Sequence, residues 1–395
     1  MGGGVFGGAS PLFNKIFYLT KEEFILSENK IKLAVLGSGN GGRAFAAQFA
    51  AKGDFSVTMY EPLAETEDFR RLRQTGEMFL KGDVECGGKI NVTMDMGEAA
   101  GDADAVFVVV PSFAHEPIFA KLIPYLRDGQ HVFVVPGNYA SFLLRKMMTE
   151  AGCAAKISIS ETASLPYACR IAAFDTVNIY KKKFRMKLGT WPLENNGAAL
   201  EIVNGVFSGV VDFFPAAGGV LEIDLDNINY TLHPMPILFN YGDIEKNPGT
   251  FRHYMDGITP LVSERMMKMD EERLAAGAAL GLDLMSTMEQ LKMYYGANSA
   301  ATIYEYVNSP ESPYKDIVGH SVKSRYLTED VPFCMVPGML MGRMAGLSMP
   351  IVSLVIETAS FLHDTEYLAK GHTMRHLGLE GMTPRRIAEH AKTAG

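Results

Sequence analysis

Short continuous apolar runs alternate with stretches of helical spacing along the first half of the chain. Each run has the length of a strand that is buried on both faces of a sheet, where no alternation with polar residues is expected. The predicted strands are Ile31–Leu36, Phe55–Tyr60, Ala105–Val110, His131–Val135 and Lys156–Ser160. The predicted helices between them are Arg43–Lys52, Glu65–Gln74, Pro117–Leu126 and Ala140–Glu150. This order predicts an α/β fold with a doubly wound parallel sheet.

The pattern changes in the middle of the chain. The basic, alternating stretch Asp175–Lys187 indicates an edge strand or hairpin that closes the first domain. Beyond Pro192 the apolar spacing is helical and predicts an all-α second domain. Its predicted helices are Asn195–Phe207, Val220–Asn227, Thr259–Leu280, Leu282–Tyr295, Met335–Ala345, Pro350–Ala359 and Pro384–Lys392. We expect an N-terminal extension at residues 1–29, an α/β domain at 30–193 and a helical domain at 194–395.

The first predicted strand ends in a glycine-rich turn with the spacing G-x-G-x-x-G. Its residues are Gly37, Ser38, Gly39, Asn40, Gly41 and Gly42. The first glycine permits a tight turn, the second lets a pyrophosphate approach the backbone, and the third lets the helix pack on the strand. The N–H groups at the start of that helix would bind the phosphates. Because a strand precedes the motif and a helix follows it, we interpret it as a dinucleotide-binding turn and not as an ordinary glycine turn.

An acidic residue after the second strand bears on the choice of dinucleotide. Glu61 follows the first glycine by about 20 residues, where a carboxylate receives the ribose 2′-hydroxyl. This spacing favours NAD. Arg70 and Arg71 lie in the next segment and could reach a 2′-phosphate, so NADP stays open.

Polar residues follow several of the predicted parallel strands. Pro111-Ser112, Pro136-Gly137-Asn138 and Glu161-Thr162 should meet at one edge of the sheet, beside the nicotinamide. Asn138 is the best candidate for a substrate or nicotinamide contact, although a glycine-asparagine turn needs no function to explain it. His115 and Glu116 could also carry chemistry, but such residues more often cap the following helix.

Composition narrows the classes of function. The net charge of −8 argues against a nucleic acid or an acidic membrane as partner, and no segment provides the ~18 apolar residues of a membrane span. The 4 cysteines form no C-x-x-C pair, so we expect no disulfide framework and no metal site. A reducing cytoplasm fits this usage best, and the methionine-rich stretch Met335–Met341 is interpreted as core packing.

Two stretches in the predicted helical domain have unusual polar residues. His233 lies in NINYTLHPMPILFN, where prolines and polar residues interrupt an apolar segment, and histidine suits reversible proton transfer near pH 7. In SRYLTEDVP, Arg325, Glu329 and Asp330 lie close together. They could form a surface ion pair, or a carboxylate clamp with an acid that orients a histidine.

The combination of VLGSGNGG, VVVPSFAHEP, ETASLPYACR, NYTLHP and SRYLTEDVP resembles the NAD/NADP octopine and nopaline dehydrogenase family, from about Ile31 to the C-terminal region. The resemblance implies a Rossmann domain, a helical domain and an active site between them. It implies reductive condensation of an amino acid with a 2-oxo acid, usually pyruvate. It also places the catalytic histidine at His233, its aspartate partner at Asp330 and the oxo-acid clamp at Arg325.

Other interpretations stay open at this point. A 3-hydroxyacid or glycerol-phosphate type dehydrogenase has the same two-domain plan and uses a lysine of the helical domain, for which Lys268 is available. A dinucleotide-binding sensor without catalysis is a different class. The amino acid, the physiological direction and the choice between a monomer and a homodimer are left undetermined by the sequence.

Overall fold

Alternate residues of the central strands face opposite sides of one sheet, and this explains their continuous apolar sequence. In β1 (Ile31–Leu36), Leu33 and Val35 belong to one buried cluster, whereas Ala34 and Leu36 belong to another. Each cluster is the core between the sheet and the helices on that side. The computed structural model describes residues 30–315, 317–318 and 321–393, so the expected extension at residues 1–29 lies outside the described part.

The large sheet has 8 strands in the order β12-β11-β8-β7-β6-β1-β2-β5. Each strand is parallel to its neighbours, with one exception: β11 and β8 are antiparallel to each other. The other strands of this sheet are β2 (Phe55–Tyr60), β5 (Asn91–Thr93), β6 (Ala105–Val108), β7 (His131–Val134), β8 (Ser158–Glu161), β11 (Arg185–Trp191) and β12 (Asp212–Pro215). The predicted doubly wound sheet is confirmed.

Helices cover both faces of this sheet. Helices α3 (Asn40–Ala50) and α8 (Asn196–Val206) contribute to the cluster on one face. Helices α5 (Met96–Ala100), α6 (His115–Leu122) and α7 (Ala140–Glu150) contribute to the other. Aromatic rings dominate the first face, where Phe107 and Phe133 stack with centroids 4.6 Å apart.

A smaller sheet of 4 strands, in the order β4-β3-β10-β9, packs against α3. Its strands are β3 (Glu77–Gly82), β4 (Cys86–Lys89), β9 (Tyr167–Ala173) and β10 (Thr176–Lys182), and α4 (Glu67–Thr75) precedes it. The predicted hairpin is thus β9–β10. The stretch expected there, Asp175–Lys187, extends into β11, which belongs to the large sheet.

The chain stays with the large sheet longer than the sequence indicates. Helix α8 packs on β11 and β12, and β12 pairs with β11 as far as Pro215. The predicted boundary between residues 193 and 194 therefore falls before the last strand of the sheet. Helix α8 has the amphipathic spacing of any surface helix, so its pattern does not indicate which domain it covers.

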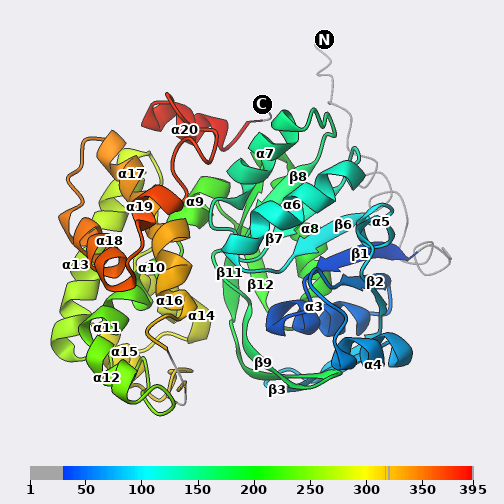
Figure 1. Ribbon diagram of the computed structural model, residues 1–395, viewed down its shortest axis with the longest axis horizontal. Helices are drawn as coiled ribbons and strands as arrows, with labels where there is room; N and C mark the ends of the chain where they lie inside the picture. The colour runs from blue at the N-terminus through cyan, green and yellow to red at the C-terminus, as the bar shows by residue number, and fades with distance from the viewer. Residues whose placement is uncertain (1–29, 316, 319–320, 394–395) are drawn as a thin grey trace, which may run out of the picture.

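The rest of the chain is helical, as predicted, and lies beside the sheet (Figure 1). The helices are α9 (Val220–Leu225), α10 (Asn229–Leu232), α11 (Pro234–Phe239), α12 (Tyr241–Lys246), α13 (Pro260–Ala279), α14 (Thr287–Tyr295), α15 (Ile303–Val307), α16 (Arg325–Thr328), α17 (Val336–Met344), α18 (Pro350–His363), α19 (Tyr367–Lys370) and α20 (Pro384–His390). A π-helical turn, Val331–Met335, joins α16 to α17.

Local capping explains one shift of a boundary. Helix α14 starts at Thr287 and not at Leu282, because Ser286 accepts from the Glu289 backbone N–H and Glu289 accepts from Ser286 in a capping box. The methionine-rich stretch is core, as interpreted, since Met335 and Met341 are buried.

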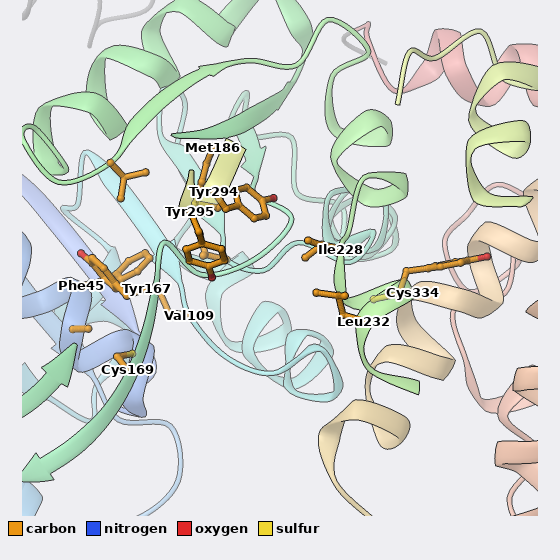
Figure 2. Packing of buried hydrophobic residues seen from close by; sticks show 14 of the residues in the cluster. Phe45, Val109, Tyr167, Cys169, Met186, Ile228, Leu232, Tyr294, Tyr295 and Cys334 are labelled. Carbon is orange, nitrogen blue, oxygen red and sulfur yellow. The ribbon is translucent and has the colours of Figure 1, made fainter. Parts of the chain in front are cut away.

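The two parts share one core. A single cluster of buried residues runs from Phe45 on α3 and Tyr167 on β9, past Tyr294 and Tyr295, to Ile228, Leu232 and Cys334 (Figure 2). The C-terminus also returns to the sheet domain, where Leu193 N donates to Lys392 O at 2.9 Å. The helical part is therefore held against the sheet from two directions.

Candidate active site

Backbone crowding explains two glycines of the turn between β1 and α3. Gly37 has a φ of +115°, and a Cβ there would lie 2.5 Å from the Val109 carbonyl oxygen. A Cβ on Gly42 would lie 1.9 Å from the carbonyl oxygen of Gly37. Both contacts are impossible for a side chain, so the tight turn and the close packing of α3 require glycine.

The middle glycine has a different environment. A Cβ on Gly39 would meet nothing within 4 Å, and Gly39 precedes α3 without any side-chain cap for the helix. The N–H groups of the first turn of α3 therefore have no capping side chain, and the space beside Gly39 is open. The backbone at this position fits a pyrophosphate, which would accept hydrogen bonds from these donors.

Asn40 and Gly41 connect the turn to the rest of the domain. The Asn40 side-chain oxygen accepts from Ile171 N of β9 at 2.8 Å. A Cβ on Gly41 would lie 2.9 Å from the side chain of Leu165. These two positions fix where the turn lies.

Glu61 directly follows β2 and lies beside the glycine turn, as its spacing predicts. One carboxylate oxygen accepts from the Ser38 hydroxyl, and the other accepts from Leu63 N at 2.8 Å. Arg70 pairs with Glu67 at 2.5 Å, and the Arg71 guanidinium lies 4.0 Å from the centroid of the Phe174 ring. Of these three side chains, Glu61 is thus the one that is anchored at the glycine turn.

His233 and Asp330 come together in the helical part. His233 lies between α10 and α11, and Asp330 directly precedes the π-helical turn. His233 Nδ1 is 2.7 Å from Asp330 Oδ2. The Tyr326 ring stacks on the imidazole at 3.5 Å, and the Tyr254 hydroxyl is 3.0 Å from Nε2. His233 is only 8% exposed, so these contacts fix both the place and the orientation of its ring.

Burial sets the electrostatics of this pair. It lowers the pKa of His233 to about 3, and Arg325 and Lys183 act in the same direction, whereas Glu329 opposes them. Burial also raises the pKa of the Asp330 carboxyl well above its usual range. The 2.7 Å contact counteracts both shifts, because each charged form stabilises the other. Burial thus favours the neutral imidazole in the free protein, and this is the form that is able to accept a proton.

Glu329 links this pair to the edge of the sheet. Its Oε1 accepts from both the backbone N–H of Ser112 at 2.8 Å and the Ser112 hydroxyl at 2.9 Å. Its Oε2 accepts from Arg325 Nε at 2.5 Å. Ser112 and Pro111 follow β6 at the edge where a nicotinamide is expected, so the predicted cofactor loop and the predicted clamp share one carboxylate.

The Arg325 side chain is exposed to solvent, where a ligand can reach it. Its side chain is 60% exposed, although Glu329 is almost completely buried. Among the residues that the structure describes, no hydrogen bond engages the terminal NH groups of its guanidinium, so they are able to bind a carboxylate.

Asn138 lies where the two domains meet, and its side chain is buried there. It is 4% exposed, and its amide nitrogen donates to the Ser112 hydroxyl at 2.6 Å. Its oxygen accepts from Asn227 at 2.6 Å and from the Cys334 thiol at 3.0 Å. Its side chain therefore connects the β7 loop to the helical part, and the substrate contact proposed for it stays a prediction.

The remaining candidates lie elsewhere. His115 is buried on α6 against Phe119, and burial lowers its pKa to about 4, while Glu116 lies on the surface of the same helix. Lys268, the lysine of the alternative interpretation, is about half exposed on α13 and lies 3.6 Å from Glu264.

Sequence reasoning missed several residues of the site. Tyr254 and Tyr326 contact His233, but tyrosines in an aromatic-rich chain give no separate signal. Lys183 is buried, its amine contacts the Ser164 hydroxyl, and burial lowers its pKa to about 7. It stands in a run of three lysines, and nothing in the sequence distinguishes it from the other two, which are only partly buried.

Two kinds of feature are absent from the described part of the chain. Within residues 30–315, 317–318 and 321–393, no group of three or more histidines, cysteines or acids is arranged to hold a metal ion. In the same part of the chain, no helix has both the length and the apolar character needed to cross a membrane.

The fold and the site define a two-domain NAD(P)-dependent oxidoreductase. Two family descriptions match the chain: the α-helical domain of NAD/NADP octopine/nopaline dehydrogenase over residues 216–363, and the N-terminus of NAD-dependent glycerol-3-phosphate dehydrogenase over residues 32–137. An opine dehydrogenase of Arthrobacter sp. (strain 1C) is 35% identical over 355 residues, which are 89% of this chain and 96% of that protein. The chain belongs to the octopine/nopaline dehydrogenase family.

Solved structures agree on the fold. Octopine dehydrogenase in complex with NADH and agmatine superposes with a TM-score of 0.74 at 19% identity, covering 93% of this chain and 99% of that one. The same enzyme in a complex with NADH and pyruvate gives 0.72 at 20% identity, with the same coverage. These structures confirm the fold class. The opine dehydrogenase at 35% identity confirms the family resemblance, and the matching family descriptions, which name NAD and NADP, support a nicotinamide dinucleotide as cofactor.

Proposed function

We propose that the protein is an NAD-dependent opine dehydrogenase that condenses an amino acid with a 2-oxo acid, with pyruvate as the oxo acid. The observation that carries the proposal is the His233–Asp330 contact at 2.7 Å. Asp330 follows Glu329, which accepts from Ser112 at the cofactor edge of the sheet, so the pair is next to that edge.

The proposed reaction consumes an amino acid, a 2-oxo acid, one hydride and one proton. The neutral amino group attacks the carbonyl carbon of the oxo acid, the carbonyl oxygen takes up the proton and leaves as water, and a protonated imine forms. NADH, when bound, supplies the hydride that reduces the imine carbon. The product is an N-(carboxyalkyl)amino acid, and the reverse reaction oxidises it.

His233 is assigned the proton transfers. Asp330 holds the proton of Nδ1 and stabilises the imidazolium, as a carboxylate does for other catalytic histidines. His233 then donates a proton to the oxygen that leaves as water, and accepts one in the oxidative direction. A neutral imidazole suits the second role, and the approach of substrate carboxylates favours its protonation for the first.

Arg325 is assigned the oxo-acid carboxylate. Its Nε is held by Glu329, and its remaining NH groups provide a two-pronged site for that carboxylate. Pyruvate is proposed because the octopine dehydrogenase of similar fold is described in a complex with NADH and pyruvate. NAD is preferred to NADP because Glu61 would repel a 2′-phosphate.

A grid of amino acids against pyruvate, glyoxylate and 2-oxoglutarate, followed by NADH absorbance, tests the proposal. We expect oxidation of NADH that depends on both substrates, and an N-(carboxyethyl)amino acid as product by mass spectrometry when pyruvate is used. Reduction of an oxo acid without any amine would favour the hydroxyacid dehydrogenase instead. Binding of NADH without turnover of any pair would favour the sensor.

The structure gives little support to the glycerol-phosphate type of enzyme. The family description for that enzyme matches residues 32–137, which belong to the dinucleotide-binding domain alone. In the helical part, Lys268 is about half exposed beside Glu264 and not beside His233. The proposed opine chemistry uses the side chains that are next to the cofactor edge.

A further inference from the structure

Both ring nitrogens of His233 have a hydrogen-bond partner: Nδ1 contacts Asp330, and Nε2 contacts Tyr254. Nε2, the atom that the proposed reaction needs for proton transfer, is 3.0 Å from the Tyr254 hydroxyl. Tyr254 is 3% exposed, and burial raises the pKa of its phenol well above the usual value. The phenol therefore keeps its proton over the whole working pH range and is able to donate it to a hydrogen bond.

The loop that carries Tyr254 is fixed beside His233 by two successive contacts. His253 Nε2 is 3.0 Å from the carbonyl oxygen of Leu232, the residue before His233. Tyr254 then contacts His233 itself. A Cβ on Gly257 would lie 2.3 Å from the His253 carbonyl oxygen, so the loop turns back tightly after Tyr254. These contacts place the Tyr254 hydroxyl at hydrogen-bond distance from Nε2 in the free protein.

Packing around the tyrosine ring further restricts it. The Tyr314 ring stacks on the Tyr254 ring with centroids 4.1 Å apart, and the Tyr254 and Tyr326 hydroxyls are 3.4 Å apart. Because Tyr326 also stacks on the imidazole, one aromatic cluster controls both the plane of the ring and the hydrogen bond to Nε2.

We propose that Tyr254 is a positioning residue for His233: its hydroxyl donates a hydrogen bond to Nε2 and, with Asp330, selects the tautomer that carries the proton on Nδ1. The proton position on an imidazole is set by the partners of its two nitrogens. An acceptor at Nδ1 and a donor at Nε2 stabilise the same neutral tautomer. Nε2 is then unprotonated in the free protein, and the reacting group of the substrate takes the place of the Tyr254 hydroxyl when Nε2 exchanges a proton with it. This inference rests on the proposed function, because it assigns Nε2 the proton transfer.

Tyr254→Phe removes the hydroxyl and keeps the ring. Since the hydroxyl stabilises the neutral imidazole, its loss should raise the pKa of His233 by about half a unit to one unit. The other titratable or charged groups near His233 remain in place in this variant: Asp330, Glu329, Arg325, Lys183, His253 and Tyr326. We expect kcat to fall by roughly threefold to tenfold, with KM for NADH unchanged.

Tyr314→Phe is the matched control. Tyr314 belongs to the same cluster, is buried, and has its hydroxyl bonded to that of Tyr295. The control therefore loses a buried hydroxyl next to Tyr254 but no contact with His233. We expect its kcat and its pH profile to match those of the wild type.

Nitrogen NMR of imidazole-labelled protein without substrates provides a measurement that needs no turnover. We expect His233 of the wild type to carry its proton on Nδ1, and Tyr254→Phe to shift its titration upward. A proton on Nε2 in the wild type, or an unchanged titration in Tyr254→Phe with an unchanged kcat, would overturn the assignment of Tyr254. Absence of turnover in the wild type would count against the proposed function and leave the NMR result to decide the role of Tyr254.

Discussion

In the sheet domain, the dinucleotide turn consists of consecutive residues from Gly37 to Gly42, and backbone geometry shapes it. In the helical part, His233 and Asp330 are 97 residues apart, and side-chain hydrogen bonds bring them together. The turn would bind with N–H groups that any sequence has, whereas the pair depends on particular side chains. A motif of the first kind can be read from a short stretch of sequence. A site of the second kind depends on the fold around it.

The largest expected effect comes from His233. His233→Ala should lower kcat by about 10²–10⁴, because the proton donor is lost, while the affinity for NADH stays near that of the wild type. Asp330→Asn should also be strongly impaired, because the amide favours the wrong tautomer. His376→Ala serves as control, since this half-buried histidine lies by Glu116 on α6. Near-normal turnover of His233→Ala would show that His233 is not the proton donor, and a lysine would then be the candidate.

Arg325 tests whether the helical part positions a substrate as well as moving protons. Arg325→Ala should raise KM for the oxo acid by about 10- to 100-fold, a range lowered by the solvent exposure of the side chain. Arg325→Lys should lie between the two, because an ammonium lacks the planar fork. KM for the amino acid and for NADH, measured in the same assays, should change little. A change confined to the amino acid would assign Arg325 to the other substrate.

The glycine turn can be divided into its structural and its binding parts. Gly42→Ala should destabilise the protein by about 1–3 kcal/mol or more in thermal unfolding, because its Cβ would lie against a backbone oxygen. Gly39→Ala should keep the wild-type Tm, since nothing surrounds that position, but weaken NADH binding by about tenfold, or about 1.4 kcal/mol. Equal affinities for NADH in Gly39→Ala and the wild type would mean that the phosphates lie elsewhere.

The smallest effect concerns cofactor choice. Because the Glu61 carboxylate should accept from a 2′-hydroxyl and repel a 2′-phosphate, NADH should have the higher kcat/KM. Glu61→Ala should reduce this preference by roughly tenfold or less, as expected for the loss of one hydrogen bond. Steady-state kinetics with both cofactors measure the ratio. Equal or better use of NADPH by the wild type would contradict the assignment of Glu61.

The sequence by itself determined the central parallel strands of the sheet domain and its glycine turn. Continuous apolar runs predict buried parallel strands, and the glycine spacing predicts the turn, because both depend on residues that are neighbours in the chain. Glu61 was also predicted from its spacing, and the structure places it beside Ser38 in the turn. His233, Asp330 and Arg325 were assigned through the family resemblance, and the pattern of the segment from Arg325 to Asp330 alone left a surface ion pair open.

Only the tertiary structure decided how the two domains share a site. Glu329 accepts from Ser112, 217 residues away, and Tyr254 reaches Nε2 of His233 from a loop that has no motif. It also decided that Asn138 is buried among side chains of the helical part and that β12 extends the sheet to Pro215. Such contacts join segments far apart in the chain, and no local period of apolar residues encodes which partner a polar side chain will meet. The order of strands and helices follows from local physics, whereas the environment of each catalytic atom follows from the packing of the whole chain.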